Sequence, residues 1–470
     1  MHTVVIDIDS LRPDHLGAYG YDAPTSPHID ALASDGVVFT NAYAANSPCM
    51  PSRAAFLSGR YGVQNGVATH GSAGQTLFEP RTKDDWDGDS TAYWTLPEVL
   101  FNGRIHTGAV SSFPRHPAPW FHGVWNEFYT PQEPVSRPNN IPTEEPRPTG
   151  LPGEGFQTPR AGTVANLAID FIKRHQETDF FLYTQFWDPH EPYNRTEEEI
   201  EEFRGETPLP PYPTADQIST HRDWDAVRSA RDMNISSRSD LQEILARYDA
   251  EIRYADKHVG RIIESLQHRG LYEDTLVMVI ADHGEEFGEH GAYRHHWSTF
   301  DGTQRIPFII KPPGGSSIPE QSMDELTTNV DLAPTVLDYF QVETPDSWHG
   351  ESLRPLMEGA DRPWRDFVVF DHGLYMAQRA VRTADWKLIR TYHSGVWAGE
   401  IPEIQLYDMT ADPWEQSDVA GSYPDVVQWL EENRLDWEDE HEGPYEDSLH
   451  RVARKDPQGY TWFKDSFDGV

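Results

Sequence analysis

The segment TLVMVIADHG (residues 275–284) passes from an apolar, β-branched run directly into Asp282, His283 and Gly284. Such a run is typical of a strand that is buried on both faces. The segment HTVVIDID (residues 2–9) has the same form and ends at Asp9. Open α/β sheets bind their ligands at the carboxyl ends of strands. We therefore expect these polar side chains to meet at one edge of a buried sheet.

Strand and helix patterns alternate through the first two-thirds of the chain. The sequence predicts further strands near 37–44, 104–110 and 179–187, and helices near 27–35, 52–58, 162–175 and 238–269. Such alternation predicts an α/β fold, with a large, mostly parallel sheet between helices. From about residue 363 consecutive strands follow, with one helix near 424–434. We expect a main domain over 1–360, a small antiparallel-sheet subdomain over 361–435 and an acidic, aromatic extension over 436–470.

Two proline-rich, acidic segments interrupt this pattern, at about 130–160 and 195–235. They are too polar for a core and too long for simple connections. We interpret them as loops or lids over a site.

The composition narrows the possible surroundings and partners. The chain has 77 acidic against 38 basic Lys and Arg residues, a net charge of −39, so nucleic acid is not an expected partner. Dense, spread carboxylates indicate adaptation to high salt, which screens their repulsion. No apolar run is long enough for a membrane helix, and the chain opens directly on a strand, so a cytoplasmic protein is expected. The oligomeric state cannot be read from the sequence.

The only cysteine of the chain is Cys49, so no internal disulfide can form. A lone cysteine is most often a small buried apolar residue. It is also a candidate thiolate nucleophile, because a helix N-terminus and Arg53 would lower its pKa. The residues around it offer a third interpretation.

The stretch SPCMPSRAAFLSGRYG (residues 47–62) resembles the sulfatase signature, in which the cysteine of Cys-x-Pro-x-Arg is oxidised to formylglycine. This resemblance implies an alkaline-phosphatase-like fold and hydrolysis of a small sulfated substrate. It also implies that a formylglycine-generating enzyme acts on Cys49. A hydrated aldehyde has two hydroxyls, so one can attack sulfur and the other can expel the product. Arg53 would neutralise an oxyanion and hold the diol.

The resemblance also implies a divalent cation held by Asp9, Asp282, His283 and the modified Cys49. Many members have a second acid after the first ligand, where this chain has Ser10. Asp7 shares a strand face with Asp9, but the family pattern does not select it. Ca²⁺ is the family default, although oxygen ligands also suit Mg²⁺ and one imidazole admits Mn²⁺ or Zn²⁺.

Two histidines are candidates for acid–base work. His190 in FWDPHEPYN resembles the family histidine that contacts the ester and protonates the departing oxygen. In GEHGAYRHHWSTF, spacing puts His296, next to His295, where many sulfatases have a lysine, and His290 belongs to the same motif.

One departure from the family stands out. The Gly-Lys-Trp-His motif of many sulfatases is missing after the strand RIHTGAV, where only His116 follows nearby. The resemblance extends to about residue 415. A phosphonate monoester or phosphodiester hydrolase of the same superfamily, or a non-catalytic binding protein with an unmodified Cys49, remains an alternative.

Overall fold

The computed structural model describes residues 1–70, 77–78, 95–112, 118–123, 125–130, 160–224, 229–231, 233–314, 318–360, 362–397, 401–441 and 445–461. Its centre is an eight-stranded sheet with the strand order β12-β2-β11-β8-β1-β7-β5-β6. Only β11 runs antiparallel to its neighbours, so the predicted large, mostly parallel sheet is confirmed. Its strands are β1 (His2–Ile8), β2 (Val37–Phe39), β5 (His106–Ser111), β6 (Glu127–Tyr129), β7 (Phe180–Phe186), β8 (Thr275–Ile280), β11 (Phe308–Lys311) and β12 (Ser322–Met323).

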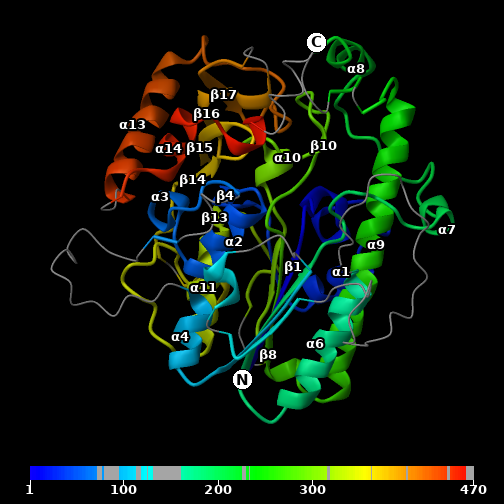
Figure 1. Ribbon diagram of the computed structural model, residues 1–470, viewed down its shortest axis with the longest axis vertical. Coiled ribbons are helices and arrows are strands. Elements are labelled where there is room, and N and C mark those ends of the chain that lie inside the picture. Colours follow the sequence, from blue (N-terminus) through cyan, green and yellow to red (C-terminus); the bar gives the residue numbers. More distant parts are fainter. Residues whose placement is uncertain are drawn as a thin grey trace.

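Helices cover both faces of this sheet. Figure 1 shows α6 (Ala161–His175) and α9 (Arg238–His268) along one side, with α4 (Leu96–Asn102) and α11 (Leu332–Tyr339) on the other. Every residue of β1, β7 and β8 is buried, which explains their continuous apolar runs. The core therefore lies in two layers, one on each face of the sheet.

Local sequence signals account for the predicted helix near residue 27. Helix α1 (Pro27–Ser34) has Ser26 at its N-cap and Pro27 at its first position. Proline suits that position because its missing N–H has no partner in the first turn. The prediction of this helix is confirmed.

A separate five-stranded sheet has the order β17-β16-β15-β14-β4. Four of its strands form the predicted antiparallel sheet, namely β14 (Phe367–His372), β15 (Ala377–Thr383), β16 (Trp386–His393) and β17 (Ile404–Asp408). The fifth, β4 (Asn46–Ser47), pairs in parallel with β14 and comes from the segment just before Cys49. The smaller sheet is thereby joined to the strand that leads into Cys49. The domain boundaries expected at 360 and 435 stay predictions.

Three sequence predictions differ in detail from the structure. The strand expected over 37–44 is split into β2 and β3 (Ala42–Tyr43), and β3 pairs with β13 (Thr327–Thr328). The segment 195–235 contains two helices, α7 (Glu197–Glu201) and α8 (Ala215–His221), each with a capping box that its short sequence supplies. Helix α13 (Pro424–His441) is longer than predicted.

The extension after residue 436 folds back onto the body of the protein. Its helix α14 (Ser448–Arg454) donates a hydrogen bond from Ser448 Oγ to the carbonyl of Gly62 at 2.8 Å. The remaining elements are η1 (Pro13–His15), η2 (Gly17–Tyr19), α3 (Gly62–Asn65), α5 (Pro119–His122), η4 (Tyr272–Asp274), β9 (Glu286–Phe287), β10 (Tyr293–His295), α10 (Asp301–Gln304), η5 (Asn329–Asp331), α12 (Arg354–Met357) and η6 (Gly395–Trp397). Within the described ranges, the structure has no helix with the length and apolar character needed to cross a membrane.

Candidate active site

Two neighbouring strands deliver acidic side chains to the same edge of the large sheet. Strands β1 and β8 pair in parallel, so Asp9 and Asp282 follow their carboxyl ends side by side. The backbone turns sharply after β1, where Ser10 has a φ of 59°. In this conformation the Ser10 N–H donates to Asp282 Oδ1 at 3.1 Å, which ties the two strand ends together.

The sequence Asp-His-Gly after β8 needs its glycine. A Cβ on Gly284 would lie 2.2 Å from the carbonyl oxygen of Gly302, too close for any other residue without a backbone shift. Asp282 and His283 themselves are fully buried. The close packing of Gly284 against the 302–303 backbone therefore fixes the segment that carries both side chains.

Helix α2 (Cys49–Ser58) brings Cys49 to this edge at its first position. The sequence predicts a start at Ser52, but the helix begins earlier because Pro51 is tolerated in a first turn. Ser52 Oγ donates to the Asp282 carbonyl at 2.6 Å and accepts from Asn329 Nδ2 at 2.8 Å. The Cys49 side chain is 2% exposed, and the helix N-terminus is anchored directly against the end of β8.

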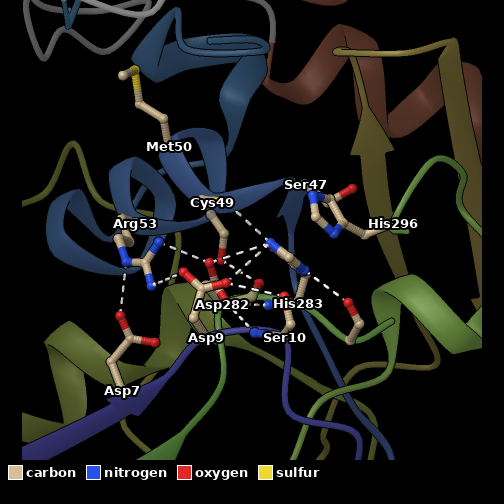
Figure 2. A network of polar contacts seen from close by, with 12 residues as sticks. Asp7, Asp9, Ser10, Ser47, Cys49, Met50, Arg53, Asp282, His283 and His296 are labelled. Carbon is tan, nitrogen blue, oxygen red and sulfur yellow. Dashed lines mark hydrogen bonds and ion pairs between the residues drawn. The ribbon is translucent and has the colours of Figure 1, made fainter. Parts of the chain in front are cut away.

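Arg53 lies beside Cys49 and contacts three carboxylates (Figure 2). Its Nε lies 2.8 Å from Asp7 Oδ2, and its Nη2 lies 3.0 Å from Asp9 Oδ2. Its Nη1 lies 2.8 Å from Asp282 Oδ2, and all four side chains are fully buried. Buried charges require such pairing, so Arg53 fixes the acidic groups of the site in place.

The donor atoms at this edge suit a cation. One ligand atom each from Asp9, Cys49, Asp282 and His283 lie within 4.8 Å of one another. The Nδ1 of His283 lies 2.8 Å from the carbonyl oxygen of Gly284, so in the neutral ring Nδ1 carries the proton and Nε2 carries a lone pair. That Nε2 faces Cys49 Sγ at 3.2 Å, Asp282 Oδ2 at 3.4 Å and Asp9 Oδ1 at 3.9 Å. The lone pairs of His283 Nε2, Asp282 Oδ2 and Asp9 Oδ1 thus converge on one point, as ligands of a divalent cation do.

The sequence leaves open whether Ser10 or Asp7 completes this set of cation ligands. The hydroxyl of Ser10 donates to Asp9 Oδ1 at 3.0 Å, so it lies at the edge of the cluster. Asp7 instead accepts from Arg53 and, at 2.6 Å, from the Tyr183 hydroxyl. Ser10 is therefore better placed than Asp7 to contribute an oxygen.

The charges around Cys49 shift its pKa and those of its neighbours. Burial and the carboxylates of Asp9 and Asp282 raise the pKa of the Cys49 thiol well above its usual value. Burial also raises the pKa of Asp282. For Asp9 burial, the largest single cause, acts in the same direction, but Arg53, His190 and His283 together outweigh it and the pKa is lowered. The protein's own side chains thus favour a thiol over a thiolate at Cys49.

The structure brings both predicted acid–base histidines to the same site. His296 is 3% exposed, its ring centroid lies 4.0 Å from that of His283, and its Nδ1 lies 3.3 Å from Glu285 Oε1. His190 is partly exposed, and its centroid lies 5.5 Å from that of His296. His190 thus lies nearer to solvent than His296.

Other histidines named from the sequence have different surroundings. The ring centroids of His295 and His296 lie 4.6 Å apart. The ring of His290 stacks on Phe300 at 3.6 Å and its Nε2 lies 3.1 Å from the carbonyl oxygen of Glu415, outside the group around Cys49. His116 lies outside the described residues.

Three residues near Cys49 are not found by sequence reasoning. Trp187 packs against Cys49, and the Met50 N–H donates to His70 Nε2 at 3.3 Å. Burial, with His283 and Arg53 adding to it, lowers the pKa of His70 to about 3. His372 lies beside Ser47 of β4, with its Nδ1 2.8 Å from Ser47 Oγ. Trp187 lies in the motif FWDPHEPYN without being singled out by it, and His70 and His372 lie in no quoted motif, because their positions depend on contacts between distant segments.

Comparison with known proteins agrees with this geometry. The family model described as Sulfatase matches residues 1–342. A second model, described as N-sulphoglucosamine sulphohydrolase, C-terminal, matches residues 288–438. An arylsulfatase of Clostridium perfringens is 25% identical over 471 residues, which cover 91% of this chain and 92% of that protein.

Two solved structures show the same fold. A putative sulfatase from Bacteroides thetaiotaomicron superposes with a TM-score of 0.73 at 20% identity, covering 94% of this chain and 92% of the other. A phosphonate monoester hydrolase of Agrobacterium radiobacter gives 0.70 at 21% identity, covering 94% of this chain and 96% of the other.

Proposed function

The chain belongs to the sulfatase family, as a hydrolytic enzyme with the alkaline-phosphatase-like fold, and we propose that it cleaves a sulfate ester at Cys49. The products would be an alcohol and inorganic sulfate. The observation that carries this proposal is the position of Cys49, at the first residue of α2 and 3.2 Å from His283 Nε2. A nucleophile derived from Cys49 would lie beside the carboxylates at the carboxyl ends of β1 and β8.

Two groups implied by the family fit the residues present. Formylglycine derived from Cys49 would supply a two-hydroxyl nucleophile, and a divalent cation held by Asp9, Asp282 and His283 would supply positive charge beside it. Ca²⁺ is the proposed ion, with Mg²⁺ or Mn²⁺ as alternatives.

The chain's own residues would orient and neutralise the sulfate group. The N-terminus of α2 presents the positive end of its helix dipole to an anion. Arg53 holds Asp9 and Asp282, so their charges stay fixed while the substrate reacts. His190, which is partly exposed, would donate a proton to the departing alkoxide, and His296 would hydrogen-bond a sulfate oxygen.

The alternative that Cys49 acts as a free thiolate receives no support from its surroundings, since burial and two carboxylates raise its pKa. The same burial bears on how the residue is modified. A formylglycine-generating enzyme could not reach a side chain that is 2% exposed. We propose that modification precedes folding. The small sulfated substrate and the cytoplasmic location stay predictions.

A phosphonate monoester hydrolase is the second candidate, because one such enzyme shares this fold over nearly its whole length. The kcat/KM values for an aryl sulfate and an aryl phosphonate monoester, measured on the same metal-loaded preparation, separate the two. We expect a higher value on the sulfate, and loss of both activities in Cys49→Ala. A higher value on the phosphonate would overturn the proposal, and activity retained by Cys49→Ala would remove Cys49 from the reaction altogether.

A further inference from the structure

A second group of metal-ligating side chains lies beside the first. One ligand atom each from Glu285, His295 and His296 lie within 4.8 Å of one another. Their side chains belong to the buried interior, with exposures of 0%, 7% and 3%. From this arrangement we infer that Glu285, His295 and His296 bind a second divalent cation next to the site formed by Asp9, Asp282 and His283.

The backbone is irregular next to this group. A bulge between Tyr293 and His295 shifts the register of β10, and Arg294 has a φ of 57°. Strand β10 ends at His295, so the alternation of a regular strand does not extend to His296. The two imidazole rings lie at 82° with centroids 4.6 Å apart. Bulges and strained non-glycine residues often re-aim side chains at functional sites.

The side chain of Arg294 does not fill the space between the histidines. Its Nη2 lies 3.3 Å from Glu191 Oε2, and its guanidinium lies over the ring of Tyr193. The basic side chain therefore lies against Glu191 and Tyr193.

The distances from the Glu285 carboxylate to its neighbours are longer than those of a tight ion pair and suit a metal ligand. Its Oε2 accepts from the Tyr193 hydroxyl at 3.3 Å, and its Oε1 lies 3.3 Å from His296 Nδ1. Charge-assisted hydrogen bonds are usually about 2.7–2.9 Å long. A cation bound at about 2.0–2.2 Å from these donors would fit between atoms at this separation.

The donor types indicate which ions would bind. Two imidazoles and one carboxylate suit Zn²⁺, Mn²⁺ or Co²⁺ better than Ca²⁺. His296 also belongs to a group with Cys49 and His283 whose ligand atoms lie within 4.8 Å of one another. The second cation would therefore lie next to the first.

The role that we assign to this cation depends on the proposed function. The binding of the cation does not depend on it. By its resemblance to the family motif, the segment GEHGAYRHHWSTF puts His296 where many sulfatases have a lysine facing the sulfate. A cation on His296 would restore positive charge at that position, which a neutral imidazole lacks.

The test counts metal ions. Chelator-stripped protein is titrated with Co²⁺, whose visible absorption reports nitrogen ligands, and the content is measured by elemental analysis. We expect two equivalents in the wild type and one in His295→Gln or Glu285→Gln. We also expect one in Asp282→Asn, with the absorption of the remaining ion differing from that in His295→Gln. Glu285→Gln preserves size and hydrogen bonding, so it gives the count if His295→Gln shows no cooperative melting transition.

A matched control is His221→Gln. His221 is a buried histidine of α8, and its Nδ1 lies 2.9 Å from the hydroxyl of Tyr293, which belongs to the same strand as His295. This variant should keep two equivalents. A single equivalent in the wild type, or two in both His295→Gln and Glu285→Gln, would overturn the inference and leave Glu285 as a hydrogen-bonding partner that orients His296. Two bound ions without sulfate-ester cleavage would contradict the proposed function alone.

Discussion

The Sγ atom of Cys49 lies 3.2 Å from Nε2 of His283, although 234 residues separate them in the sequence. One residue begins a helix, and the other follows the carboxyl end of a central strand. Each is held by a local contact, namely the hydrogen bond of Ser52 to the Asp282 carbonyl and the close approach of Gly284 to the Gly302 carbonyl. The contact between a helix N-terminus and a strand end creates the site, and the ion pairs of Arg53 stabilise it (Figure 2).

Replacing Arg53 should show how much this arrangement depends on one guanidinium. Arg53→Met would leave Asp7, Asp9 and Asp282 buried without their counter-charge, so we expect a loss of about 3–5 kcal/mol in the free energy of unfolding. Urea denaturation monitored by circular dichroism measures it. The control, Arg204→Met, removes only surface ion pairs and should change stability far less. Equal effects of the two substitutions would contradict the structural role of Arg53.

The sequence predicts the sheet edge well because strand ends are local signals. Apolar runs that stop at Asp9 and Asp282 identify two buried parallel strands without any knowledge of contacts. The pairing of β4 with β14 is not predictable in this way, because two residues carry no strand pattern of their own. The place of His70 and Trp187 in the site is not predictable for the same reason, since only the packing of distant segments brings them to Cys49.

Asp282 should be essential for binding the first cation. In Asp282→Asn the amide is a weaker ligand than a carboxylate, so we expect activity to fall by at least ~100-fold while the fold survives. The measurement is turnover of an aryl sulfate in chelator-treated buffer, before and after Ca²⁺ is restored. Turnover at the wild-type rate in the chelator-treated variant would remove Asp282 from the ligand set.

His190 should matter most for substrates whose alcohol leaves poorly. General acid catalysis contributes about 10²–10⁴-fold, and a nitrophenolate leaving group needs little of it. We expect His190→Asn to lower kcat/KM by ~100-fold or more on an alkyl sulfate, and much less on nitrophenyl sulfate. An equal loss on both substrates would indicate that His190 binds the sulfate group rather than protonating the leaving group. His221→Gln, which alters a buried histidine in α8, should leave the ratio unchanged.

High salt should stabilise the fold, because the net charge of −39 repels itself within one molecule. At 1 M salt the screening length is about 3 Å, against about 10 Å at 0.1 M. We expect the melting temperature to rise steadily as KCl increases from 0.1 M to molar concentrations. A melting temperature that stays level or falls over this range would contradict adaptation to high salt.

The state of Cys49 decides between the two nucleophiles. If the residue is the precursor of formylglycine, the active protein should resist thiol-alkylating reagents and react with hydrazides, and mass spectrometry should find its peptide lighter than the cysteine form. Cys49→Ser offers one hydroxyl at the α2 N-terminus, which can attack sulfur but has no second hydroxyl to expel the sulfate. We expect at most one turnover and a sulfated serine at residue 49. Cys49→Ala should show neither, while its metal content stays close to that of Cys49→Ser, because Asp9, Asp282 and His283 remain. Sustained turnover by the serine variant at the wild-type rate would show that a second hydroxyl is not needed, and the aldehyde mechanism would have to be abandoned.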